Sequence, residues 1–179
     1  MNFAIILAGG SGSRAGGPLP KQFQMLDDTR ILWHSVKAFK SFDEDCRIIL
    51  VVNPSFLKDW DRMFGAEENE LGFTIYKTEG GATRIQSVKK GLEKIQSIIE
   101  KSGENPTVYI HDSARPRVTP DLMKRAEKLV RKGVGAIPVV GLSDSIRQLT
   151  GGGTVAVNRA DYVAVQTPQV FLFEDKKCT

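Results

Sequence analysis

Short apolar runs alternate with longer stretches of helical periodicity along this chain. A run in which nearly every side chain is apolar predicts a strand buried on both faces, whereas apolar residues that recur every three or four positions predict a helix. By this pattern the predicted strands are residues 3–7, 47–52, 73–77, 107–110 and 135–140. The predicted helices are residues 31–39, 56–64, 84 to about 101, and 121–132.

The last of these helices has clear boundary signals. Thr119 stands at the N-cap position, where a hydroxyl oxygen accepts a hydrogen bond from a backbone N–H of the first turn. Pro120 occupies the first helical position, where a missing N–H costs nothing. Gly133 follows the last position, as is common at the end of a helix.

The alternation of strands and helices predicts an α/β fold. It indicates βαβ units, and hence a Rossmann-like, mainly parallel sheet flanked by helices. Ligands of such sheets bind at the carboxyl ends of the strands. Polar clusters follow four predicted strands: a glycine loop after residue 7, and residues 80–87, 111–116 and 144–147. We therefore expect these four clusters to converge on one edge of the sheet.

The composition allows a single domain, residues 1–179, and narrows the choice of partners. With 41% hydrophobic residues, a chain of 179 residues can bury one sizeable core. A net charge of +4 suits an anionic small molecule, and no basic block with interleaved aromatic residues indicates nucleic acid. Cys46 and Cys178 are too few for a disulfide framework and fit a reducing cytoplasm. We expect no membrane span and no signal peptide.

The most informative segment is the glycine loop after the first strand. It reads Leu7-Ala8-Gly9-Gly10-Ser11-Gly12-Ser13-Arg14 and is followed by Pro20-Lys21-Gln22-Phe23. Glycines let backbone N–H groups close on an oxyanion, because they carry no Cβ and reach positive φ. The two cations beyond them can neutralise the charge that develops during phosphoryl or nucleotidyl transfer. The segment therefore predicts a triphosphate site.

Two better-known loops do not account for this segment. The P-loop pattern fails, because the lysine here follows a proline and precedes a glutamine. Residues 10–15 match the dinucleotide fingerprint formally, but Pro18 and Pro20 interrupt any helix that begins there. The second predicted strand also ends on Asn53 where an acidic ribose ligand is expected. A dinucleotide-dependent dehydrogenase is thus the weaker interpretation.

Five motifs carry a resemblance that covers nearly the whole chain. They are Leu7-Ala8-Gly9-Gly10-x-Gly12-x-Arg14 with Pro20-Lys21-Gln22-Phe23, then Gly80-Gly81-x-x-Arg84-x-x-Ser87-Val88, then His111-Asp112-Ser113-Ala114-Arg115-Pro116, then Arg159, and then Gln166-Thr167-Pro168-Gln169-x-Phe171. In order and spacing they resemble the 2-C-methyl-D-erythritol 4-phosphate cytidylyltransferase family of non-mevalonate isoprenoid biosynthesis. Ribitol-5-phosphate cytidylyltransferase is its close relative.

This resemblance implies a reaction and a division of roles. CTP and a polyol phosphate would give a CDP-polyol and pyrophosphate, with Mg²⁺ and without a covalent enzyme intermediate. Arg14 and Lys21 would be the catalytic residues, stabilising the pentacoordinate α-phosphate and the departing pyrophosphate. The nucleotide would be held by Leu7, Ala8, Gly9, Gly10, Gly12, Gly80, Gly81, Arg84, Ser87, Asp112, Ser113 and Ala114.

Further roles follow from the same resemblance. Asp112 would hold the ribose or Mg²⁺, with an indirect role near the metal preferred; it could also only cap a turn. Arg159 would bind the polyol phosphate, and Arg115 would orient its loop or the substrate. We interpret His111 as a packed strand residue and His34 as a helix residue. For residues 166–169, shaping the sheet edge is preferred to a catalytic role.

Residues 142–158 resemble the projecting arm of the family, which crosses to a second subunit. A homodimer is therefore expected, with Arg159 at the base of the arm serving the site of the partner subunit. The family also continues with an acidic-Ala-Ser segment and a lysine near Asn-Ile-Lys that helps hold the polyol phosphate. This chain ends at Thr179 without either, so the C-terminal part of the fold is expected to be missing.

Three functions remain open from the residues alone. The first is synthesis of CDP-methylerythritol, favoured by residues 111–116 and 158–162. The second is synthesis of CDP-ribitol, which residues 7–10 and 20–23 fit equally well. The third is an inactive CTP-binding domain, suggested by the missing C-terminal elements.

Overall fold

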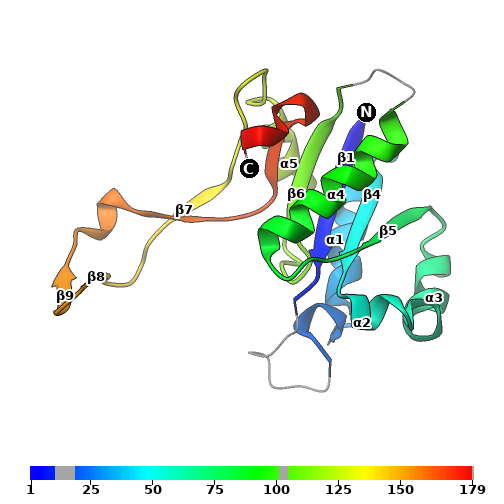
Figure 1. The fold of residues 1–179 in the computed structure, drawn as a ribbon, viewed down its shortest axis with the longest axis horizontal. Helices are drawn as coiled ribbons and strands as arrows, with labels where there is room; N and C mark the ends of the chain where they lie inside the picture. The colour runs from blue at the N-terminus through cyan, green and yellow to red at the C-terminus, as the bar shows by residue number, and fades with distance from the viewer. Residues whose placement is uncertain (11–18, 101–104, 179) are drawn as a thin grey trace.

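A five-stranded sheet lies at the centre of the computed structural model, which describes residues 1–10, 19–100 and 105–178. Its strand order is β11-β6-β1-β4-β5 (Figure 1). Strands β6, β1, β4 and β5 run parallel to one another, and β11 runs antiparallel to β6. The strands are β1 (Asn2–Ala8), β4 (Arg47–Val52), β5 (Ile75–Glu79), β6 (Thr107–Asp112) and β11 (Gln169–Leu172).

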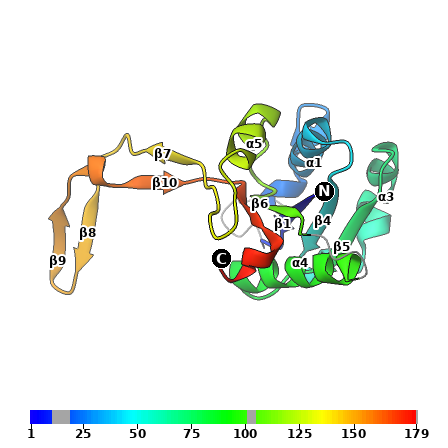
Figure 2. The ribbon, with the colours of Figure 1, turned by 90° about the horizontal axis from the view of Figure 1, so that it is seen from above.

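Helices cover both faces of this sheet. Figure 2 shows α4 on one face and α1 and α5 on the other. Helix α4 approaches β1 closely at Gly91, where an added Cβ would lie 2.7 Å from the Cγ2 atom of Ile5. The helices are α1 (Ile31–Phe42), α2 (Pro54–Leu57), α3 (Trp60–Glu70), α4 (Arg84–Ile99) and α5 (Pro120–Glu127).

Alternate residues of the central strands supply two separate apolar cores. On β1, Ile6 belongs to the core beneath α1, α3 and α5, whereas Ile5 belongs to the core beneath α4. Strand β4 divides in the same way between Leu50 and Val51. All four side chains are fully buried, which explains why these strands read as continuous apolar runs.

The predicted elements of the sheet domain are largely confirmed. Strand β4 has the predicted bounds, and Thr119 caps α5 by accepting a hydrogen bond from the backbone N–H of Leu122. The helix predicted at 56–64 is divided into α2 and α3. Helix α5 ends at Glu127, earlier than predicted, because the chain tightens there into i→i+3 hydrogen bonds.

The prediction that residues 135–140 form a strand of the central sheet is wrong. Within this segment, Ala136 forms only an isolated bridge to Val170. The chain then departs from the sheet into β7 (Val139–Gly141), which pairs with β10 (Val163–Val165). Apolar character alone predicted a strand but did not identify its partner.

Residues 139–165, called the arm below, project from the sheet domain (Figures 1 and 2), so the predicted arm is present and extends beyond the expected bounds of 142–158 at both ends. The ribbon of β7 and β10 leads to a hairpin of β8 (Arg147–Thr150) and β9 (Gly153–Ala156). The 3-10 turn η2 (Arg159–Asp161) stands between β9 and β10.

Three short elements complete the fold. The 3-10 turn η1 (Lys21–Phe23) and the small hairpin of β2 (Met25–Leu26) and β3 (Thr29–Arg30) precede α1. The 3-10 helix η3 (Phe173–Cys178) follows β11. Among the described residues, no helix combines the length and apolar character needed to cross a membrane.

Candidate nucleotide site

Two glycine segments meet where β1 and β5 end. An ideal Cβ on Gly80 would lie 3.3 Å from the carbonyl oxygen of Val52, 3.4 Å from Ser87 Oγ and 3.6 Å from the Cα of Gly9. The backbones after β1 and β5 thus approach each other with little room for a side chain. Such bare backbone allows the close approach of a phosphate or a base.

The segment after β1 is held by two side-chain amides. Gln22 is buried and donates from Nε2 to the carbonyl oxygens of Ala8 (3.2 Å) and Gly10 (3.0 Å). Asn53 reaches the carbonyl oxygen of Gly9 at 3.4 Å. Lys21 is exposed and directly precedes Gln22 on η1, so the same bonds tether the catalytic candidate to the loop.

The turn after β5 is held by the first turn of α4. The backbone N–H of Gly81 donates to Ser87 Oγ (3.0 Å), and that of Ala82 donates to Gln86 Oε1 (2.8 Å). Thr83 caps α4 by accepting from the backbone N–H of Gln86. A Cβ on Gly81 would lie 2.3 Å from that of Gln86, so only glycine fits without rearrangement.

The end of β6 carries a charged cluster of Arg84, Asp112 and Arg115, called the arginine cluster below. Arg84 Nε donates to Asp112 Oδ1 (3.3 Å), and Arg115 Nε donates to Oδ2 (3.1 Å). Arg84 is the first residue of α4, where the helix dipole disfavours a cation. The Asp112 carboxylate offsets that repulsion. One carboxylate between two guanidinium groups leaves the cluster with a net positive charge, which suits an anion.

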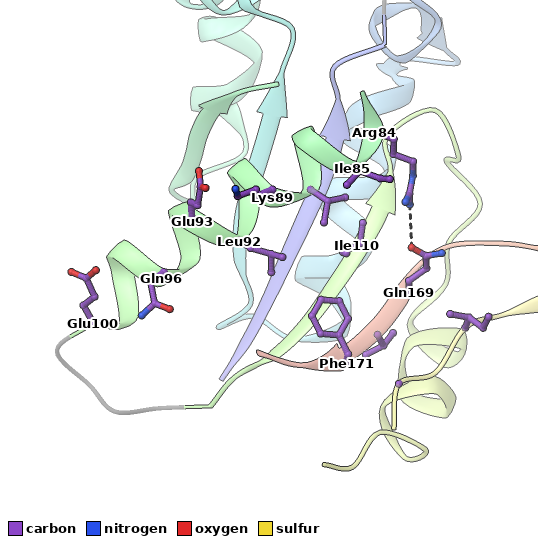
Figure 3. A pocket seen from close by; sticks show the side chains of 14 residues that line it. Arg84, Ile85, Lys89, Leu92, Glu93, Gln96, Glu100, Ile110, Gln169 and Phe171 are labelled. Atoms are coloured by element: carbon purple, nitrogen blue, oxygen red, sulfur yellow. Dashed lines mark hydrogen bonds between the residues drawn. The ribbon is translucent and has the colours of Figure 1, made fainter. Parts of the chain in front are cut away.

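Two glutamines extend this cluster. Arg115 donates from its NH1 group to Gln166 Oε1, and Arg84 donates from its NH2 group to Gln169 Oε1 (3.3 Å; Figure 3). Sequence reasoning preferred a purely structural role for both. The available signal was a pair of glutamines three residues apart, the second of which begins the strand beside β6, but this spacing could not identify the arginines as their partners.

His111 is the packed strand residue that the sequence predicted, since it is fully buried. Burial lowers its pKa to about 4, so the ring is neutral at pH 7. Its Nε2 lies 3.1 Å from the carbonyl oxygen of Arg115, which can only accept, and Nδ1 therefore accepts from the Thr167 hydroxyl at 2.9 Å. The Thr167 oxygen in turn lies 3.4 Å from the backbone N–H of Asp112.

The remaining predicted residues fall into three groups. Ser113 ties β6 to β1, because its hydroxyl donates to the carbonyl oxygen of Leu7 at 2.7 Å, and Ala114 follows it. His34 lies in α1, as predicted. Gly12 and Arg14 lie outside the described residues.

The fourth polar cluster does not join the site. Residues 144–147 and Arg159 lie on the arm, because the chain leaves the sheet at β7 (Figure 1). Arg147 bonds to Thr154 across the β8–β9 hairpin, and Arg159 donates to the carbonyl oxygen of Ser143. The expectation that four clusters converge within one chain is therefore wrong for this one.

A groove of about 1070 Å³ begins beside the arginine cluster and runs between α4 and β11 (Figure 3). Arg84 and Gln169 stand at one end, and Glu100 stands at the other. Leu92 and Phe171 line its middle, so an apolar stretch separates the cluster from the polar end at Glu93, Gln96 and Glu100.

No group of three or more histidine, cysteine, aspartate or glutamate side chains that could hold a metal ion occurs in residues 1–10, 19–100 and 105–178. Asp112 is the carboxylate of the arginine cluster, and both of its oxygens already accept from arginines. This donor set fits a Mg²⁺ that substrate phosphates and waters hold, rather than one bound by protein groups alone.

Comparison with known proteins decides the family. Residues 2–177 match the family model described as 2-C-methyl-D-erythritol 4-phosphate cytidylyltransferase. The chain belongs to this family. It is therefore a nucleotidyltransferase, as the five motifs implied, and the match supports the methylerythritol interpretation over the ribitol enzyme and the inactive domain.

Relatives in this family cover most of the chain. The 2-C-methyl-D-erythritol 4-phosphate cytidylyltransferase of Azobacteroides pseudotrichonymphae is 36% identical over 170 residues, which is 95% of this chain and 72% of that protein. The enzyme of that name from Bacteroides thetaiotaomicron is 37% identical over 170 residues, 95% of this chain and 74% of its own.

Solved structures show the same fold. A 4-diphosphocytidyl-2C-methyl-D-erythritol synthase superposes with a TM-score of 0.72 at 23% identity, covering 96% of this chain and 75% of that one. The synthase from Anaerococcus prevotii gives a TM-score of 0.73 at 21% identity, covering 100% of this chain and 76% of that one.

Proposed function

We propose that this cytidylyltransferase joins CTP to 2-C-methyl-D-erythritol 4-phosphate. An oxygen of the acceptor phosphate attacks the α-phosphorus, a new P–O bond forms, and the bond to the β-phosphate oxygen breaks. CDP-methylerythritol and pyrophosphate are the products. The observation that carries the proposal is the meeting of two bare glycine backbones with the arginine cluster at the carboxyl ends of β1, β5 and β6.

Positioning and charge stabilisation account for this chemistry without a nucleophilic residue. Lys21 stabilises the negative charge on the α-phosphate and on the departing pyrophosphate, together with Arg14. The tether of Gln22 to the carbonyl oxygens of Ala8 and Gly10 supports this role, because it keeps Lys21 beside the loop.

The segment after β5 holds the cytidine. Backbone carbonyl oxygens of this turn would accept from the cytosine amine, whereas the N–H groups of Gly80 and Gly81 donate to the Val52 carbonyl oxygen and to Ser87 Oγ and keep the turn closed. Arg84 and Arg115 supply positive charge for the phosphates. Arg115 also orients residues 111–116 through its bond to Asp112.

The reaction is expected to use Mg²⁺, which substrate phosphates and waters would hold beside Asp112. When bound, it neutralises charge on the triphosphate and lowers the barrier to phosphorus–oxygen cleavage. Asp112 would contact it through a water, because one carboxylate seldom binds Mg²⁺ without substrate phosphates and waters. This agrees with an indirect role for Asp112 near the metal.

We infer that the active unit is a homodimer in which the arm contacts a second subunit. Val140, Leu149 and Val163 are large apolar side chains exposed on the arm, and a second copy of the chain would cover such residues. Arg159 would then bind the acceptor phosphate in the site of the partner subunit. We also infer a location in the cytoplasm, which agrees with the small number of cysteines and with the anionic, nucleotide-type substrates.

Release of pyrophosphate tests the proposal. The protein is incubated with CTP, Mg²⁺ and either methylerythritol phosphate or ribitol phosphate, and CTP binding is measured separately by calorimetry. Turnover with methylerythritol phosphate alone is expected. A preference for ribitol phosphate would contradict the acceptor, and CTP binding without turnover on either would point to the inactive domain.

A further inference from the structure

We propose that Gln166 and Gln169 are positioning residues that hold the two guanidinium groups of the arginine cluster in place around Asp112. The inference rests on the proposed function, since it assigns these glutamines a part in nucleotidyl transfer. It goes beyond the sheet-edge role that their sequence suggests.

The contacts are specific to each glutamine. Arg84 comes from the start of α4 and Arg115 from the loop after β6, and each reaches a different amide oxygen. Both arginines use Nε for the carboxylate of Asp112 and a terminal nitrogen for a glutamine. Two points of attachment define the plane of a guanidinium group, whereas one leaves it free to rotate.

The segment that carries the glutamines is itself firmly placed. Gln169 pairs with Ile110 in the antiparallel ladder of β11 and β6, so continuing this register brings Thr167 opposite Asp112. Thr167 is buried, and its hydroxyl group contacts His111 and the backbone of Asp112. The backbone that carries each glutamine is therefore fixed, and each side chain contacts one arginine.

An amide is the suitable acceptor at these two positions. A guanidinium has five N–H donors and keeps its charge at every physiological pH. A carboxylate in place of Gln169 would also accept from Arg84, but it would cancel the net positive charge that attracts the triphosphate. The neutral oxygen of Gln169 orients Arg84 and leaves that charge intact.

Steady-state kinetics with three variants test whether the glutamines orient the arginines without changing the charge of the cluster. We expect Gln169→Leu and Gln166→Leu to lower kcat about tenfold at an unchanged melting temperature, because orientation is lost. Gln169→Glu should keep kcat within about twofold and raise the KM for CTP about fivefold or more, because it adds negative charge. Asn69→Leu, at an exposed amide on α3, is the matched control and should behave as the unsubstituted protein.

Two kinetic outcomes would overturn the proposal. One is wild-type kcat and KM in both leucine variants. The other is that Gln169→Leu and Gln169→Glu lose activity equally and that both also melt at a lower temperature. Residues that only shape the sheet edge would behave in this way. Absence of turnover in the unsubstituted protein would contradict the proposed function instead.

The arginine Nε–H signals in proton–nitrogen NMR spectra provide a readout that needs no turnover. The signals of Arg84 and Arg115 are assigned with Arg84→Lys and Arg115→Lys. Gln169→Leu should shift or broaden the Arg84 signal and leave that of Arg115, and Gln166→Leu should do the reverse. Unchanged signals in both variants would refute the positioning role whatever the activity.

Discussion

The nucleotide site and the arm are built in opposite ways. At the site, the backbone of each loop is tied to a side chain from another segment, as Gln22 ties Ala8 and Gly10 and as Ser87 ties Gly81. The arm is a narrow ribbon whose apolar side chains face outward, with Leu149 82% exposed. One chain can thus preorganise the nucleotide half of the site, while the arm becomes buried only against another surface.

The largest expected effect concerns the charge at the site. Lys21→Ala should lower kcat about 10²- to 10⁴-fold, because a group that stabilises the transition-state charge is lost, while the fold stays intact. Pyrophosphate release measures kcat, and a melting curve shows whether the fold is intact. Lys58→Ala, at an exposed lysine on the neighbouring α2 cap, is the control. Near-normal turnover in Lys21→Ala would refute its catalytic role.

Alanine substitutions of one glycine in the candidate site and one in the arm allow a direct comparison of their effects on CTP affinity. Gly81→Ala would place a Cβ 2.3 Å from that of Gln86, so we expect the turn to shift and CTP affinity to fall about tenfold or more. Gly151→Ala, at the tip of the arm hairpin, meets nothing within 4 Å and should leave affinity unchanged. Calorimetric titration with CTP measures the difference, and equal affinities would show that the turn after β5 is not part of the nucleotide site.

A charge on the arm tests whether a second copy covers it. Leu149→Asp should weaken the proposed dimer about tenfold or more, because a buried carboxylate would lack a partner, and turnover per chain should fall with it. Thr150→Asp, which points to the opposite face of β8, is the control. Light scattering gives the masses, and a monomeric mass for the unsubstituted protein would contradict the dimer.

The smallest effect is a loss of stability in mild acid. The unfolded chain protonates histidine near pH 6.5, whereas buried His111 stays neutral down to about pH 4. Its contribution is therefore fully present well above pH 6.5 and is lost as pH falls toward 4, by about 1 kcal/mol between pH 6.5 and 5.5 and by at most about 1.4 kcal/mol per pH unit below that.

Denaturant unfolding at pH 7 and at pH 5.5 measures this loss. His34→Gln should retain it, and His111→Gln should lack it. An identical pH dependence in His111→Gln and the unsubstituted protein would show that the buried ring does not contribute.

The motifs and the sheet domain were predictable because their signals are local. A buried strand such as β4 shows its apolar run directly, and Thr119 and Pro120 mark the start of α5 within three residues. The glycine loop and residues 80–87 were placed correctly at strand ends for the same reason. The family resemblance rested on these local motifs.

The sequence by itself therefore determined the α/β class, the polar clusters at the carboxyl ends of the strands and the family. Only the tertiary structure decided that residues 135–140 leave the sheet for the arm, and that Gln166 and Gln169 meet Arg115 and Arg84. Hydrophobic periodicity describes one segment at a time, whereas these partners depend on strand order and on the antiparallel register of β11 beside β6. The pairing of segments that are far apart in the sequence cannot be predicted from the pattern of residues within one segment.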